Sequence, residues 1–205
     1  MNLKTFTRWS GYLLALGGLL LICAEVAYML TPEGKESILT PTGRAAGVFF
    51  FSGAIFLTLG LPGVYVRQAE AAGRLGLGAF FTVLAGSALM IASDWSELFA
   101  APAMLQIPGF EESFPPELIA GFMLNYGLYT LGWLLFGVAT LRAKVFPRPL
   151  AILLIAGILL PFVGMFALHF PGDFMPCYLA FAWLGVAAAR GPRPSPAALG
   201  EPLAA

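Results

Sequence analysis

The sequence predicts an all-α bundle of six transmembrane helices with both termini in the cytoplasm. Three observations lead to this prediction: an apolar composition, six apolar runs of spanning length, and a regular alternation of charge between the segments that join them. Of the 205 residues, 59% are hydrophobic and only 11% are charged, too few charges for a soluble domain of this size. The net charge is zero, so the chain lacks the overall positive charge that favours nucleic-acid binding.

The six apolar runs define the predicted spans. They cover residues 11–30, 47–66, 75–93, 118–141, 149–169 and 174–190. A bilayer core about 30 Å thick needs roughly 20 apolar residues per helix, so only short loops remain between the runs. Residues 1–190 are therefore predicted to form a single transmembrane domain. The Pro- and Ala-rich segment 191–205 has no hydrophobic periodicity and is predicted to be a disordered cytoplasmic tail.

Charge sets the predicted orientation, because cytoplasmic loops next to spans retain Lys and Arg. With the N-terminus inside, the inner segments hold nine of the eleven basic residues, and the outer segments hold only Lys35 and Arg44. The outer segments also hold most of the acids. Because the alternation holds at every segment, a missing or extra helix would spoil it. Lys4 and Arg8 before an apolar run also fit a signal peptide, but this run is long for one and no clear cleavage site follows.

A weak repeat links the three helices that are predicted to run from outside to inside. In each, a Gly-Val pair precedes an arginine, at 63–64, 137–138 and 185–186. The pattern suggests three related hairpins in a parallel arrangement. Many secondary transporters have inverted repeats instead, so the pattern is slight evidence against that class.

Enzyme and cofactor signatures are missing from the sequence. It contains no G-x-S-x-G elbow, H-E-x-x-H motif, P-loop or C-x-x-C pair, which argues against the enzyme classes that these motifs mark. The single histidine, His169, cannot supply paired axial ligands to a b-type haem. No lysine lies within a predicted span, which argues against a retinal Schiff base.

Polar residues gather near the outer ends of the predicted spans. Glu25 is the one acid well inside a span, and Asn125 lies at a matching depth in the fourth span, so we expect the two to share a polar site. Asp94 and Glu97 are three residues apart, a spacing that places them on one face if the third helix continues. His169 and Asp173 flank the turn between the last two spans. Trp133 lies deeper, where it either lines a cavity or fills the bundle.

The functional interpretation of these residues is a polar pocket open to the outer side. Its candidate ligand-binding residues are Glu25, Asn125, Asp94, Glu97 and Trp133. Asp94, Glu97 and His169 are weak candidates for metal ligands, because carboxylate and imidazole suit divalent ions. In the alternative interpretation, the outer residues are ordinary interfacial side chains in water, and Glu25 is neutral and hydrogen-bonded to a neighbouring helix.

The run GVYVRQAEAAGRLGLGAFF, followed by DWSELFAAPAM and by LGWLLFGVATLRAKVFPRPLAILLIAG, resembles small multi-pass proteins from bacterial genomes that carry no assigned activity. The similarity covers about residues 47–160. It implies a multi-pass protein of the bacterial cytoplasmic membrane, and it transfers no catalytic or binding residue.

The leading functional hypothesis is a non-enzymatic membrane protein that binds a partner protein, an apolar small molecule or a lipid. A compact bundle with few charges offers lipid-facing surface and little chemistry. Membrane lipids, a membrane protein partner or a second copy of the chain are the expected partners. One alternative is a small transporter or proton-coupled carrier that uses Glu25. The other is a metal-dependent membrane enzyme that uses Asp94, Glu97 and His169.

Overall fold

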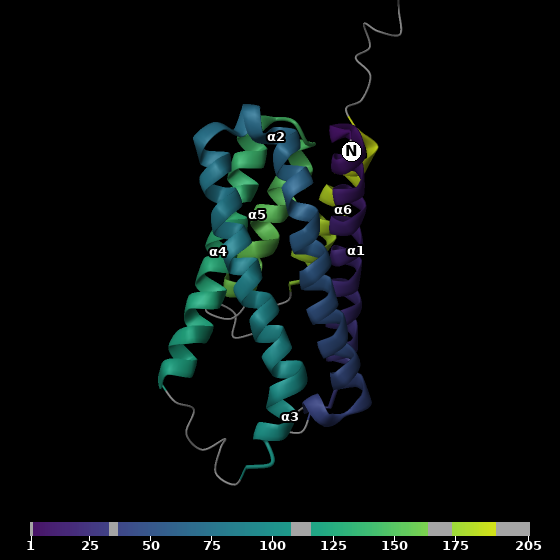
Figure 1. Cartoon of the computed structure of the whole chain (residues 1–205), viewed down its shortest axis with the longest axis vertical. Helices are drawn as coiled ribbons and strands as arrows, with labels where there is room; N and C mark the ends of the chain where they lie inside the picture. Colours follow the sequence, from purple (N-terminus) through teal and green to yellow (C-terminus); the bar gives the residue numbers. More distant parts are fainter. Residues whose placement is uncertain (1, 33–36, 108–115, 164–173, 192–205) are drawn as a thin grey trace, which may run out of the picture.

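The computed structural model describes residues 2–32, 37–107, 116–163 and 174–191, and within these ranges all regular structure is helical. The five main helices are α1 (Leu3–Met29), α2 (Pro41–Trp95), α4 (Pro116–Ala143), α5 (Arg148–Val163) and α6 (Met175–Arg190). Three short segments complete the fold: η1 (Ser37–Leu39), η2 (Ser96–Ala100) and α3 (Ala101–Met104) (Figure 1). The predicted all-α class is confirmed.

Three helical stretches are long and apolar enough to cross a membrane: Leu3–Met29, Pro41–Met104 and Pro116–Ala143. Two shorter apolar helices follow, within α5 and α6. The six separate spans of the sequence prediction are thus found only in part, because the second and third fall within one helical stretch. Residues 164–169 of the predicted fifth span and residues 192–205 of the predicted tail lie outside the described ranges.

Helix α2 consists of two arms that meet at Gly73. This residue has φ 55° and ψ −147°, a conformation that is essentially restricted to glycine. The arms before and after it turn back on each other, since Tyr65 and Phe80 stack with their ring centroids 4.4 Å apart. Figure 1 shows the two arms as neighbouring columns, the first blue and the second teal. The long stretch therefore holds two antiparallel helices.

The helices form a closed sequence of neighbours. Helix α1 packs between the first arm of α2 and α6, the second arm of α2 packs on α4, and α5 packs between α4 and α6. At these contacts, glycines bring the backbones of neighbouring helices so close together that no side chain fits between them. A Cβ added to Gly18 would lie 2.5 Å from the backbone nitrogen of Ala182, and one added to Gly86 would lie 2.5 Å from that of Tyr129. Small residues of this kind allow helices to approach each other closely in a lipid environment.

The two ends of the bundle differ in charge. The start of α1, the bend at Gly73, the turn from α4 to α5 and the end of α6 lie at one end (Figure 1), which we call the basic end. Its basic residues are Lys4, Arg8, Arg67, Arg74, Arg142, Lys144, Arg148 and Arg190. Arg67 connects helices there: its Nη1 donates to the carbonyl oxygens of Ala187 and Ala188, both at 2.6 Å. The opposite end, which we call the acidic end, holds Asp94, Glu97 and Glu117 together with Arg44.

Candidate functional site

The acidic end contains a cavity of about 360 Å³ between α1, α2, α4 and α6. Three carboxylates line it, from Glu25 on α1, Asp94 at the end of α2 and Glu97 on η2. The rest of the wall consists of Tyr28, Phe50, Met90, Tyr126, Tyr129, Thr130, Phe174 and Tyr178. We call this space the outer cavity. Its lining is a mixture of acids and aromatic rings, contributed by residues far apart in the sequence.

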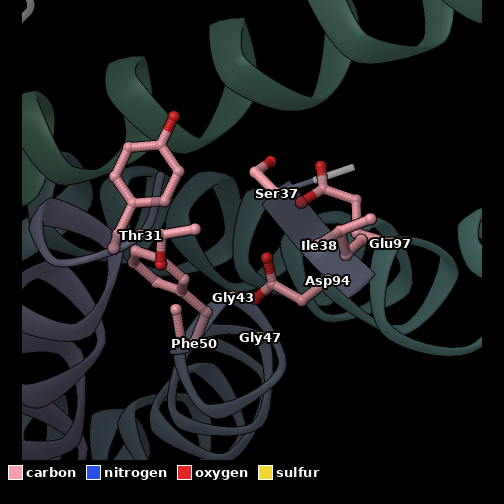
Figure 2. Close-up of a pocket in the computed structure, with 10 residues that line it drawn as sticks. Thr31, Ser37, Ile38, Gly43, Gly47, Phe50, Asp94 and Glu97 are labelled. Atoms are coloured by element: carbon pink, nitrogen blue, oxygen red, sulfur yellow. The ribbon is translucent and has the colours of Figure 1, made fainter. Parts of the chain in front are cut away.

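A smaller cavity of about 240 Å³ adjoins the outer cavity and shares Tyr28, Phe50, Asp94 and Glu97 with it. Its other wall residues come from the α1–α2 connection and the first turns of α2. Figure 2 shows Asp94 and Glu97 on one side of this space and Thr31 and Phe50 on the other. The two carboxylates are therefore accessible from both cavities.

Local helix geometry brings Asp94 and Glu97 together. Helix α2 ends at Trp95 and is continued by η2, a single wide turn of five residues, so the chain stays helical through both acids. Such wide turns within helices occur frequently at functional sites. Side chains three positions apart on a helix are neighbours, and both acids accordingly line the same two cavities. This end of α2 presents a pair of carboxylates to the cavity.

Glu25 reaches the same cavity from α1. It is 9% exposed, in a helix whose neighbouring positions are apolar. Burying a carboxyl group costs several kcal/mol unless it is compensated. A position in the wall of a polar cavity is therefore more favourable for Glu25 than one surrounded by apolar side chains. Glu25, which was predicted from its depth in the bilayer, and Asp94 and Glu97, which were predicted from their spacing, thus lie around one space.

Aromatic rings form most of the remaining wall. Phe174 and Tyr178 stack in nearly parallel planes with centroids 6.2 Å apart. Tyr126 and Tyr129 are three residues apart on α4 and face the cavity together. The sequence analysis did not identify these tyrosines, although their i, i+3 spacing beside Asn125 is a signal that could have found them. The faces of such rings attract cations.

Asn125 takes another position than the sequence suggested, whereas Trp133 takes the second of its two expected positions. Asn125 is buried, and its Nδ2 donates weakly to the sulfur of Met90 at 3.8 Å, so it lies behind the cavity wall. Its Oδ1 has no hydrogen-bond partner among the described residues, and the expected hydrogen bond from Glu25 is therefore not formed. Trp133 is fully buried. Its ring packs 4.3 Å from Phe181 between centroids, so it fills the bundle core.

A metal site is not formed by the residues whose structure is described. Within those ranges, no group of three or more His, Cys, Asp or Glu side chains is arranged to hold a metal ion. His169 and Asp173, which the sequence analysis added to the outer polar group, lie outside the described ranges. Of the three candidate metal ligands, only Asp94 and Glu97 lie within the described ranges, and they supply two carboxylates.

Fold and site together define an all-α protein with three helices suited to crossing a membrane and with an acidic, aromatic cavity at one end. Comparisons with protein-family models, with curated proteins and with solved structures find no match.

Proposed function

We propose that this chain crosses a bacterial cytoplasmic membrane six times, with its basic end in the cytoplasm, and binds a small organic cation in the outer cavity. The six crossings are α1, the two arms of α2, α4, α5 and α6. In support, neighbouring helices run in opposite directions, and α5 and α6 contribute fully buried Leu154 and Phe181 to the same core as α1 and α4. The orientation follows from the positive-inside rule, since the basic end carries eight Lys and Arg residues among those whose structure is described.

The chemistry of the outer cavity favours a cation. Three carboxylates surround a space of about 360 Å³, and a positive ligand would lower the cost of keeping them charged in a low-dielectric setting. The aromatic rings of Tyr28, Tyr126, Tyr129 and Tyr178 add cation–π attraction. The volume lies within the range of small-molecule sites. A substituted ammonium ion with an apolar part matches both the carboxylates and the aromatic rings of the cavity wall.

The convergence of Glu25, Asp94 and Glu97 on an aromatic-walled cavity is the observation that carries this proposal. It refines the broader expectation of a non-enzymatic binding protein for an apolar ligand or a partner. A carrier that couples the same cation to protons is a second candidate. It is favoured by the burial of Glu25, because a buried acid that meets the cavity can exchange a proton for the cation.

Calorimetric titration of the purified chain in neutral detergent tests the proposal. We expect benzyltrimethylammonium to bind at least tenfold more tightly than neutral benzyl alcohol, since desolvated cation–π contacts are worth about 2 kcal/mol. Asp94→Asn should weaken binding of the cation on the order of tenfold. Glu117→Gln is the matched control, because Glu117 is an exposed acid at the same end that does not line the cavity.

Equal affinity for the cation and the alcohol would overturn the proposal, as would an equal loss in the Asp94→Asn and Glu117→Gln variants. Glu25→Gln separates the two candidates. In proteoliposomes, cation uptake that follows an imposed pH gradient in the unmodified chain but not in Glu25→Gln selects the carrier. Binding without uptake selects the binding protein.

A further inference from the structure

The basic end contains a second, larger cavity of about 750 Å³ between α1, α2 and α6. Four cationic side chains line it: Lys4 and Arg8 from the first turns of α1, Arg67 from α2 and Arg190 from the last turn of α6. No carboxylate belongs to its described wall. We call this space the basic cavity. It brings four positive charges from three helices to one place.

The four cationic side chains differ in how much of their charge is already engaged by neighbouring groups. Arg67 is held in place by its two bonds to the carbonyls of Ala187 and Ala188 and by the ring of Phe146, whose centroid lies 5.2 Å from its guanidinium carbon. By covering the carbonyls at the C-terminus of α6, it removes acceptors that would repel an anion. Lys4, Arg8 and Arg190 are exposed. Their charges are available to a ligand.

Arg8 is positioned for such a contact. Its Nε donates to the Tyr12 hydroxyl at 3.1 Å, and its guanidinium carbon lies 5.7 Å from the centroid of the same ring. This arrangement orients the guanidinium group. Within the described ranges its two terminal nitrogens have no hydrogen-bond partner, so they are available for a bidentate contact. Such a fork matches the oxygens of a phosphate group.

The surroundings of the basic cavity place it at the level of lipid headgroups in the proposed membrane orientation. Trp9 and Tyr12, which are 61% and 45% exposed, lie beside it on α1 and contact each other edge to face with centroids 5.9 Å apart. Exposed aromatic side chains of this kind mark the membrane interface. Basic pockets between helices on the cytoplasmic side bind anionic lipid headgroups.

We propose that the basic cavity binds the phosphate group of an anionic phospholipid from the cytoplasmic leaflet, through Lys4, Arg8 and Arg190. This inference rests on the membrane orientation given above but not on cation binding in the outer cavity, which is about one helix length away. The chemistry that it requires, a phosphate with at least one negative charge, is shared with free inorganic phosphate. The experiment therefore includes both sources.

Native mass spectrometry of the full chain, titrated with phosphatidylglycerol in neutral detergent, tests the proposal. The test variant is Arg8→Gln/Arg190→Gln, and the matched control is Arg142→Gln/Lys144→Gln, which removes the same charge from the same end outside the cavity wall. At roughly fivefold per positive charge, we expect the test variant, which lacks two charges, to lose on the order of thirtyfold in lipid affinity. The control should change less than threefold, and phosphatidylcholine should bind poorly to every variant.

Three results would overturn the inference. If the test variant keeps its affinity for phosphatidylglycerol, or if the control loses as much, the lipid follows overall charge and the cavity is not a site. If inorganic phosphate at millimolar concentration displaces the lipid completely, the phosphate that the cavity holds is the free ion. Cation titration of the outer cavity in the test variant should be unchanged, so failure here is distinguishable from failure of the proposed function.

Discussion

Adding two methyl groups at the α1–α6 contact should destabilise the bundle by about 2 to 6 kcal/mol, because one overpacked site typically costs about 1 to 3 kcal/mol. In Gly18→Ala/Gly185→Ala, each new Cβ would meet backbone instead of a movable side chain. The first would lie 2.5 Å from the nitrogen of Ala182, and the second 2.6 Å from the carbonyl oxygen of Gly11. Since backbone cannot move aside, α1 and α6 must move apart where these glycines meet the facing helix.

Denaturation with sodium dodecyl sulfate in mixed micelles, followed by circular dichroism, measures this loss. Gly127→Ala is the control, because a Cβ at Gly127 would meet nothing within 4 Å and alanine has the higher helix propensity. The control should be neutral or slightly stabilising. A double variant as stable as the unmodified chain would mean that α1 and α6 do not pack through these glycines.

Replacing Arg67 by methionine is the second change with a large expected effect. Methionine keeps a long apolar stem but removes the guanidinium that bonds to the carbonyls of Ala187 and Ala188 at 2.6 Å. Hydrogen bonds to a charged group contribute about 1.5 to 3 kcal/mol each, and here one nitrogen serves both acceptors, so their contributions overlap. We expect a loss of about 2 to 4 kcal/mol in the free energy of unfolding.

The same unfolding assay measures the effect, with Arg74→Met as the control. Arg74 follows the bend in α2 and is exposed, so its replacement should change stability by less than about 0.5 kcal/mol. Arg67→Lys should recover only part of the loss, because an ammonium group lacks the planar face with which guanidinium packs over the Phe146 ring. Equal stability of the Arg67→Met and Arg74→Met variants would contradict the assigned anchoring role.

The apolar runs locate most of the helices, and the differences from prediction have local causes. The predicted span 118–141 lies within α4, Pro116–Ala143. Helix α1 begins at Leu3, well before the predicted start at 11, because its polar first turn is capped by the Asn2 side chain, which accepts from the Lys4 amide at 3.1 Å. Helix capping of this kind does not depend on hydrophobicity.

The connection between the second and third predicted spans was expected to be a loop of eight residues, 67–74. Residues such as Gln68, Glu70 and Ala72 are good helix formers, and the helix continues through them to a single break at Gly73. The charge of this segment indicates a cytoplasmic position, whereas its helix propensity indicates that the helix continues. Gly73 is needed because of its backbone conformation, but the sequence alone does not distinguish it from the other glycines nearby.

The sequence could predict how deep in the membrane each site residue lies, but not which way its side chain faces around the helix. Counting residues along each helix placed Glu25, Asp94 and Glu97 near one end of the bundle, and all three line the outer cavity. Asn125 has a matching depth but lies behind Met90. A shift of one position turns a side chain by about 100° around a helix, and only the packing of neighbouring helices decides which side faces the cavity.

Accessibility of the outer cavity from outside the membrane is the measurement that tests the central claim most directly. Cys23 and Cys177 are the two native cysteines, so both are replaced by alanine before new ones are introduced. Ser37→Cys lies in the wall of the cavity that adjoins the outer cavity, and Ala71→Cys lies at the basic end beside the bend in α2. Spheroplasts of a bacterial host are treated with a membrane-impermeant maleimide.

We predict that Ser37→Cys is labelled in intact spheroplasts and is protected by benzyltrimethylammonium, whereas Ala71→Cys is labelled only after permeabilisation. Labelling of Ala71→Cys but not of Ser37→Cys in intact spheroplasts would contradict the account.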